Sequence, residues 1–198
     1  MRAFLRLSQA FILLLLACSA AQADPVRIVA LGDSNFGAPG VSRDQAYPAQ
    51  LEAALRARGV DAQVTNAGVN GDTTTGVLAR MDSAVPQGTD VVLLSVGVND
   101  VKVHGGSQAS VNANVAQIVS RLRARGIEVV VQPTGKPWQG SIAEDPKLHV
   151  EGQDGSKGPK PGTTNWHLTP QGYAMVVART MPQVMAAIAK AKSKKKKG

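Results

Sequence analysis

The sequence predicts an α/β protein in which a parallel sheet of four or five strands carries helices on both faces. Short, β-branched apolar segments alternate along the chain with segments whose apolar residues recur at helical spacing. Parallel strands need crossover connections, which helices normally supply. With 198 residues, 43% of them apolar, the chain has room for one ordinary domain with a full core.

Four segments have the composition of buried strands. They are residues 26–31, 62–65, 90–96 and 128–132. The first ends at Gly32, and the third is the most apolar of the four. The second is weak and leads into a loop over residues 66–72. Ligand sites of such sheets lie at the carboxyl ends of the strands, so the segments that follow these strands are the ones to search for chemistry.

Helices are expected between the strands and after the last of them. Their apolar stripes cover residues 45–58, 73–84, 108–125 and 169–190. Pro182 lies inside the last of these segments and is expected to kink it or to split it in two. Residues 133–163 precede the last of these helices and show neither strand nor helix periodicity, because 11 of these 31 residues are Gly or Pro. They are expected to form one long loop.

The positive charge of the chain is concentrated at its two ends. There are 22 basic and 14 acidic residues, which give a formal charge of +8. Arg2, Arg6 and six lysines within residues 190–197 account for this excess. The rest of the chain is formally neutral, so no nucleic-acid partner is expected for the body of the protein. The lysine-rich segment, residues 191–198, is either a disordered solubilising tail or a weak contact to an anionic membrane.

The N-terminus has the three zones of a secretory signal. Two arginines precede an unbroken apolar run over residues 10–18, and Ala21-Gln22-Ala23 has the pattern of a signal peptidase site. The run is shorter than the ~20 residues of a membrane-spanning helix. We expect residues 1–23 to be a signal peptide, residues 24–190 to form the domain, and the protein to be periplasmic or secreted. A buried N-terminal helix is an alternative, as is a lipoprotein anchored through Cys18, the only cysteine.

Three polar or small residues follow the expected strands. Ser34 comes directly after the first strand, Gly71 lies in the loop after the second, and Asn99 follows the third. A serine hydroxyl at such an edge can act as a nucleophile, and the neighbouring N–H groups can stabilise an oxyanion. Taken singly, each of the three also fits an ordinary turn.

A histidine precedes the last helix. His167 is followed by Thr169, a helix cap, and Pro170, which suits the first helical position. This placement makes His167 a plausible general base, with His104 and His149 as weaker competitors in polar loops. Since no His/Cys cluster has metal-ligand spacing and no nucleotide-binding glycine motif is present, no metal or cofactor is expected.

In this order, the four segments resemble the GDSL or SGNH hydrolases. They read Gly-Asp-Ser34, Asn-Ala-Gly-Val-Asn-Gly71, Gly-Val-Asn99-Asp and His167-Leu-Thr-Pro-Gln-Gly-Tyr. The similarity covers most of residues 26–190 and is greatest to the small periplasmic acyl-thioesterase and lysophospholipase branch. It implies a three-layer, flavodoxin-like fold and a substrate that is a small acyl ester, a thioester or a lysophospholipid.

The resemblance also implies a mechanism. Ser34 would be the nucleophile and His167 its base, while the N–H groups of Ser34 and Gly71 and the Asn99 side chain would form the oxyanion hole. An acyl-enzyme on Ser34 would then be released by water. Asp33 and Asp100 would shape their loops rather than take part in the chemistry.

The sequence departs from the family pattern in three places. Thr164 stands where the family has an aspartate three residues before the histidine. Either a backbone carbonyl or a loop acid, Asp154 first, orients His167 instead, or the activity is reduced. Residues 35–37 differ from the family and are expected to change the rim of the pocket. The loop over residues 133–163 is expected to rebuild the substrate wall, with Trp138 and Trp166 either contacting substrate or anchoring the loop. Because of Thr164, a non-catalytic ligand-binding protein is the alternative.

Overall fold

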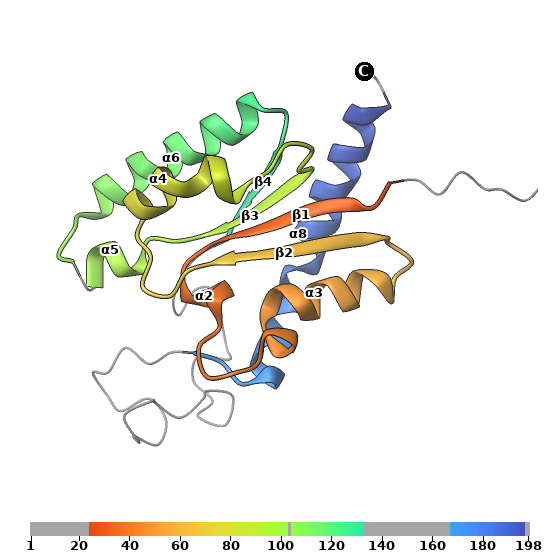
Figure 1. Ribbon diagram of the computed structural model, residues 1–198, viewed down its shortest axis with the longest axis horizontal. Coiled ribbons are helices and arrows are strands. Elements are labelled where there is room, and N and C mark those ends of the chain that lie inside the picture. Colours follow the sequence, from red (N-terminus) through yellow and green to blue (C-terminus); the bar gives the residue numbers. More distant parts are fainter. Residues whose placement is uncertain (1–23, 103, 133–166, 197–198) are drawn as a thin grey trace, which may run out of the picture.

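The four strands of the structure form one parallel sheet. The computed structural model describes residues 24–102, 104–132 and 167–196. Within these residues the strands lie in the order β2-β1-β3-β4 (Figure 1). Their bounds are β1 Val26–Gly32, β2 Ala62–Gly68, β3 Val91–Ser95 and β4 Glu128–Val131. The parallel sheet and its alternation with helices confirm the expected fold class.

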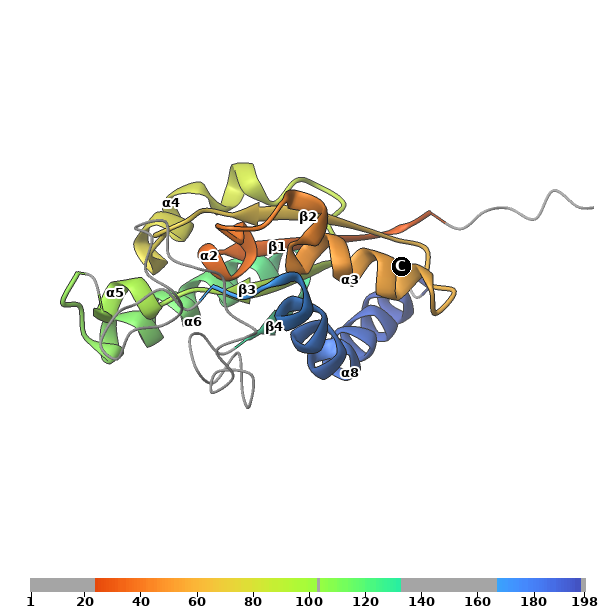
Figure 2. The same ribbon diagram turned by 90° about the horizontal axis from the view of Figure 1, so that it is seen from below.

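Helices connect the strands, and the last helix ends the described part of the chain. They are α2 Ser34–Gly37, a 3₁₀ turn at Arg43–Gln45, α3 Tyr47–Arg56, α4 Thr74–Ala84, α5 Val98–Lys102, α6 Gln108–Ala124 and α8 Pro170–Lys195. Figure 2 shows α3 and α8 side by side, and the two helices are in contact. Each predicted helix is present, with its ends shifted by a few residues.

Alternate side chains of the strands point into two separate cores. Ile28, Ala30 and Leu93 are buried with the apolar faces of α3 and α8. Val29 and Leu31 point the other way and are buried with residues of α4 and α6. A sheet buried on both faces explains why β3 and the part of β1 from Ile28 onward read as apolar runs rather than as alternating ones.

Two segments that the sequence assigned to loops are regular. β2 continues through Gly68, because Ala67 and Gly68 pair in register with the last two residues of β1. Asn99 belongs to the short helix α5. Neither segment has a strong pattern of its own, and for β2 the pairing with β1 decides the structure.

The last helix is one continuous element that is longer than expected. α8 runs to Lys195, and Pro182 neither splits it nor ends it. Met181 and Val184, on either side of the proline, are buried in the core, and this packing offsets the lost backbone hydrogen bond. Lys190, Lys192, Lys194 and Lys195 are therefore helical, not part of a disordered tail. Within the described residues, no helix is both long and apolar enough to span a membrane.

Candidate active site

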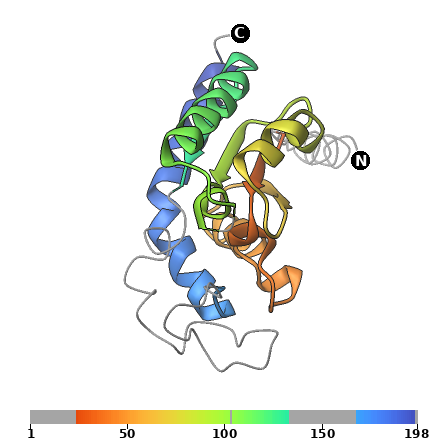
Figure 3. The same cartoon turned by 90° about the vertical axis from the view of Figure 1, so that its left-hand side faces the viewer.

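Three strand ends meet at one edge of the sheet. β1 lies between β2 and β3, and all three strands are parallel. Ser34 begins the element after β1, Gly71 lies in the turn after β2, and Asn99 lies in the helix after β3. The topology therefore brings three of the predicted site residues to the same edge. Figure 3, which looks onto the α5 side of the molecule, shows α2 between α5 and the first turns of α8.

Ser34 is the first residue of α2 and is half-buried. Asp33 caps this short helix by accepting the Asn35 N–H at 2.9 Å, and its own N–H donates to the Ser95 carbonyl at 3.0 Å. Gly32 allows this close approach, because a Cβ there would lie 2.0 Å from the Ser95 carbonyl oxygen. Within the described part of the chain, the Ser34 N–H donates to no acceptor.

The residues after Ser34 turn inward. Phe36 is fully buried in the core beside Tyr47, and the Asn35 side chain is buried and donates to the Ser95 hydroxyl at 2.9 Å. The expectation that residues 35–37 form the rim of the pocket is therefore wrong for Asn35 and Phe36. These two side chains lie on the buried face of α2, which packs directly on the sheet.

Gly71 occupies a position that favours glycine. Its φ angle is +78°, and it is exposed. Residues with a Cβ rarely adopt this conformation, which here turns the chain from β2 towards α4. Among the described residues, the Gly71 N–H has no acceptor.

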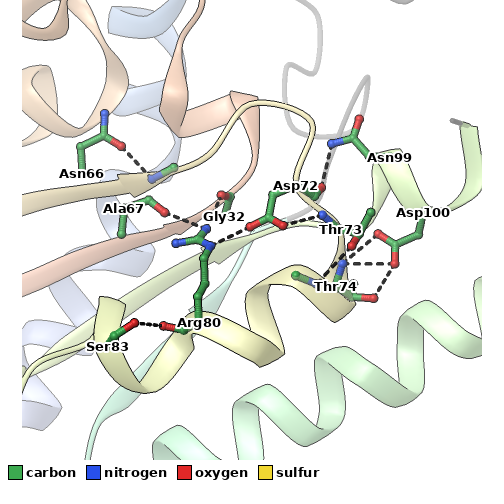
Figure 4. A network of polar contacts seen from close by, with 12 residues as sticks. Gly32, Asn66, Ala67, Asp72, Thr73, Thr74, Arg80, Ser83, Asn99 and Asp100 are labelled. Atoms are coloured by element: carbon green, nitrogen blue, oxygen red, sulfur yellow. Dashed lines mark hydrogen bonds and ion pairs between the residues drawn. The ribbon is translucent and has the colours of Figure 1, made fainter. Parts of the chain in front are cut away.

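The Asn99 side chain is fixed by one hydrogen bond. Its Nδ2 atom donates to the Asp72 carbonyl oxygen at 2.8 Å (Figure 4). An amide nitrogen carries two hydrogens, so one remains for a second acceptor. The contact also links the loop that holds Gly71 to the helix that holds Asn99.

A polar network that the sequence analysis missed holds these loops together. Arg80 Nε lies 2.8 Å from Asp72 Oδ2, and Arg80 Nη2 donates to the carbonyl oxygens of Gly32 and Ala67 at 3.0 Å each. One guanidinium thus joins the ends of β1 and β2 to the start of α4, as Figure 4 shows. Arg80 lies eight residues after Asp72, which itself precedes α4, so the pair does not have the three- or four-residue spacing that would have revealed it in the sequence.

Asp100 ties the start of α4 to α5. Its carboxylate accepts the Thr74 N–H at 3.0 and 3.1 Å and also accepts the Thr74 hydroxyl. Asn114, on α6, donates to the same hydroxyl at 2.9 Å. These contacts agree with the loop-shaping role that was expected of Asp100.

Asp33 is a buried acid. Its side chain is fully buried, and no described residue forms a hydrogen bond with Oδ2. Burial, and in smaller part the nearby charges of Asp72 and Asp100, raises the pKa of Asp33 to about 7, although the hydrogen bond from the Asn35 N–H lowers it. The pKa of Tyr173, on α8, is also raised, mainly by burial and in smaller part by Asp33. Asp33 and the first turn of α8 therefore lie within electrostatic reach of one another.

His167 precedes α8 at this same end of the molecule. It is half-buried, and Leu168 beside it is fully buried in the core that contains Phe36 of α2. Thr169 caps α8 by accepting the Gly172 N–H at 3.3 Å, and Pro170 is the first helical residue. The predicted helix start is thus confirmed, and it fixes the backbone next to His167.

The remaining candidates are not part of this cluster or are not described. His104 is exposed and lines a polar pocket of about 410 Å³ together with Asp100. Asp154, Thr164 and His149 lie outside the described residues, as do Trp138, Trp166 and the expected loop over residues 133–163. In the described part of the chain, no group of three or more His, Cys, Asp or Glu side chains is placed to hold a metal ion.

A protein-family model matches most of the chain. The model of the GDSL-like lipase/acylhydrolase family matches residues 30–150, which include Ser34, Gly71 and Asn99. His167 lies outside the matched range.

Two curated proteins and a solved structure are similar to the chain. An arylesterase of Vibrio mimicus is 30% identical over 127 residues, 64% of this chain and 63% of that protein. Esterase TesA of Pseudomonas aeruginosa is 32% identical over 111 residues, 56% of this chain and 55% of that protein. The matched region thus spans less than two thirds of either relative. A crystal structure of TesA has the same fold, with a TM-score of 0.68 and 20% identity over 81% of this chain and 99% of that one.

Proposed function

The chain belongs to the GDSL-like lipase/acylhydrolase family, and we propose that it is a serine esterase that works through an acyl-enzyme on Ser34. The observation that carries this proposal is the meeting of three strand ends at one edge. It supplies a half-buried serine together with two N–H groups that have no acceptor among the described residues, those of Ser34 and Gly71. The esterase names of both curated relatives support the same reaction class.

In the proposed first step, His167 removes the hydroxyl proton as Ser34 Oγ attacks the carbonyl carbon of the ester. The carbonyl oxygen becomes negative and is stabilised by the N–H groups of Ser34 and Gly71 and by the free hydrogen of Asn99 Nδ2. The C–O bond to the alcohol then breaks, and the alcohol leaves with the proton held by His167. Water attacks the acyl-enzyme in the same way, which releases the acid and restores Ser34.

The Asn99 donor is held in place before substrate binds. Its bond to the Asp72 carbonyl and the Asp72–Arg80 ion pair are both internal to the protein. A donor that needs no reorganisation contributes about 3 kcal/mol to transition-state stabilisation in serine hydrolases. This geometry favours acyl transfer over simple ligand binding.

The proposed substrates are small acyl esters, and thioesters and lysophospholipids are the more specific candidates. They share one feature, a carbonyl that becomes an oxyanion when attacked. Aryl esters of short acids are the first substrates to test, because one of the relatives is named an arylesterase.

The test is covalent labelling with a fluorophosphonate, with hydrolysis of a short-chain p-nitrophenyl ester measured in parallel. We expect the label on Ser34 and its loss in Ser34→Ala and His167→Ala. Ser83→Ala is the matched control, because Ser83 is an exposed serine on α4. Circular dichroism shows whether each variant is folded. Unchanged turnover in folded Ser34→Ala would refute the mechanism.

A non-catalytic ligand-binding protein is the second candidate, and Thr164 is the observation that favours it. In triad hydrolases a carboxylate orients the histidine, and replacing it with an amide costs about 10⁴ in rate. This candidate predicts saturable binding of an ester with no label on Ser34. Turnover by the native chain separates the two candidates. Thr164→Asp then tests the cause, because restoring the acid should raise turnover if its absence is what limits the reaction. If Asp154 orients His167 instead, Asp154→Asn should lower turnover.

We also propose that the protein is exported and cleaved after Ala23. The sequence zones of residues 1–23 support this location, either in the periplasm or in the medium. Mass spectrometry of the purified protein distinguishes the outcomes. A chain that starts at Asp24 supports cleavage by signal peptidase, whereas a lipid on Cys18 supports a lipoprotein.

A further inference from the structure

The Arg80 side chain joins the three segments that carry the candidate oxyanion donors. These donors are the N–H groups of Ser34 and Gly71 and the side chain of Asn99, and they follow β1, β2 and β3 respectively. Donors on separate segments keep a fixed spacing only if neighbouring groups lock their supports together. Arg80 lies on α4, outside all three segments, and Figure 4 shows its guanidinium directed at the ends of β1 and β2.

The first contact of Arg80 is with the segment that leads to Ser34. Arg80 Nη2 donates to the Gly32 carbonyl oxygen at 3.0 Å, two residues before Ser34. The same oxygen also accepts the Val69 N–H at 2.9 Å. A carbonyl oxygen has two lone pairs, and here both are used. The two donors fix the peptide group from which the chain turns into α2.

Further contacts hold the turn that contains Gly71 on both of its sides. Before the turn, Arg80 Nη2 donates to the Ala67 carbonyl oxygen at 3.0 Å. After the turn, Arg80 Nε donates to Asp72 Oδ2 at 2.8 Å. The Asp72 N–H donates to the Val69 carbonyl oxygen at 3.1 Å and closes the turn. The direction of the Gly71 N–H is therefore set inside a turn whose two ends are attached to one guanidinium.

The third donor is held through Asp72. Asn99 Nδ2 donates one hydrogen to the main-chain carbonyl oxygen of Asp72 at 2.8 Å. The Asp72 side chain is fixed in turn, because Arg80 donates to one carboxylate oxygen and the Thr73 N–H donates to the other at 2.9 Å. The direction of the second Nδ2 hydrogen of Asn99 thus depends on the position of Asp72, and that position depends on Arg80.

The shape of the guanidinium matters as well as its charge. Nε and Nη2 of Arg80 together contact three oxygens, those of Gly32, Ala67 and the Asp72 carboxylate. The pair is also largely shielded from water, since the Asp72 side chain is 10% exposed and that of Arg80 is 25% exposed. A lysine has one nitrogen on a flexible stem and lacks the planar set of donors that meets these oxygens from fixed directions.

We propose that Arg80 is the positioning residue of the oxyanion hole, and that it sets the directions of the Gly71 N–H and the Asn99 amide through their supports. The kinetic part of this inference rests on the proposed function, because an oxyanion forms only when Ser34 attacks an ester. A misplacement of about 1 Å at a distance from the reacting atoms can lower the rate about 10²-fold. Because Arg80 acts on donors to the oxyanion, its loss should lower kcat and leave KM nearly unchanged.

Steady-state hydrolysis of a short-chain p-nitrophenyl ester tests the kinetic effect. Arg80→Ala should lower kcat at least about tenfold and change KM less than about twofold. Arg80→Lys keeps the charge and should recover only part of the loss. Full recovery in Arg80→Lys would show that the charge alone is sufficient and would overturn the positioning role.

Met81→Ala is the matched control for lost stability. Met81 is the next residue on α4, and its side chain is fully buried in the core between α4, α6 and the sheet. Truncation of a buried methionine destabilises a protein strongly, so urea unfolding can show that both variants are weakened. Under conditions where circular dichroism shows each variant to be folded, Met81→Ala should keep kcat within about twofold of the native value. An equal loss of kcat in Met81→Ala and Arg80→Ala would overturn the proposal.

The double variant Arg80→Ala/Asn99→Ala tests whether Arg80 acts through Asn99. Two residues that act independently give losses that multiply, whereas residues that act through one another do not. The loss of kcat in the double variant should be smaller than the product of the two single losses by at least about fivefold. Losses that multiply would contradict the proposal.

Nuclear magnetic resonance of the substrate-free protein separates this inference from the esterase proposal. The side-chain amide signals of Asn99 are assigned from their absence in Asn99→Ala, and the Gly71 N–H signal is assigned along the backbone. Both should shift or broaden in Arg80→Ala and stay in place in Met81→Ala. Unchanged signals in folded Arg80→Ala would overturn the positioning role even if turnover falls. If the native chain hydrolyses no ester, the proposed function fails, and these signals still decide whether Arg80 holds the two donors.

Discussion

Replacing Asp33 with asparagine should remove a large part of the pH dependence of folding stability. The Asp33 carboxyl is fully buried, and Oδ2 has no hydrogen-bond partner among the described residues. Loss of hydration, together with the smaller effect of the Asp72 and Asp100 charges, raises its pKa from 3.8 to about 7. Asparagine has nearly the same shape, cannot ionise, and caps helices as well as aspartate does.

The sign follows from the raised pKa. Between about pH 4 and pH 7 the folded state keeps a proton on Asp33 that the unfolded chain has already lost. Binding of this proton stabilises the folded protein fully at pH values below the pKa of Asp33 in the unfolded chain. The stabilisation is lost as the pH rises through the pKa of Asp33 in the folded protein. A shift of about 3 pH units corresponds to about 4 kcal/mol. Stability should therefore fall with rising pH across this window and level off above it.

Urea unfolding at several pH values between about 4 and 8 provides the assay. The free energy of unfolding of Asp33→Asn, relative to that of the native chain, should rise by about 4 kcal/mol across this range. Asp82→Asn is the matched control, because Asp82 is an exposed carboxylate on α4. It should keep the pH dependence of the native chain. If the free energies of unfolding of Asp33→Asn and the native chain changed with pH in the same way, the reasoning would be refuted.

Three further predictions concern the loops around Ser34. Gly71→Ala and Gly59→Ala both place a Cβ at positive φ in open space, so each should cost about 1 kcal/mol of stability. Only Gly71→Ala should lower kcat, because a turn that relaxes from this φ moves the Gly71 N–H away from the oxyanion; equal kcat values in two variants of equal stability loss would contradict the role of this N–H. Arg80→Ala should lower the free energy of unfolding in urea by about 3 kcal/mol, because it leaves the nearly buried Asp72 carboxylate unpaired. Arg121→Ala breaks the exposed pair with Asp82 and should lower it by less than about 1 kcal/mol. Asn99→Ala should lower kcat for a p-nitrophenyl ester about 10²-fold with little change in KM, and an effect on KM alone would contradict an oxyanion role.

The parts of the fold that the sequence predicted are those with a strong local pattern. β3 and the part of β1 from Ile28 onward are apolar runs because both faces of the sheet are covered, and α6 carries an apolar stripe. Thr169 and Pro170 mark the start of α8. Each of these signals lies within one segment, so it can be read without knowledge of the neighbours.

The errors lie where a distant part of the chain determines local structure. β2 was expected to end early because residues 66–68 have little strand preference, but pairing with β1 extends it to Gly68. Pro182 was expected to break the last helix, but the burial of Met181 and Val184 keeps it continuous. In both cases contacts between elements outweigh a local preference.

The sequence alone determined the order of the elements and the candidates Ser34, Gly71, Asn99 and His167, because each lies next to a strand end or a helix start that can be read locally. The tertiary structure decided what surrounds them. The raised pKa of Asp33 and the contacts of Arg80 with the ends of β1 and β2 depend on residues that are distant in the sequence. Electrostatic interactions and burial depend on distance in space, and only the folded chain sets those distances.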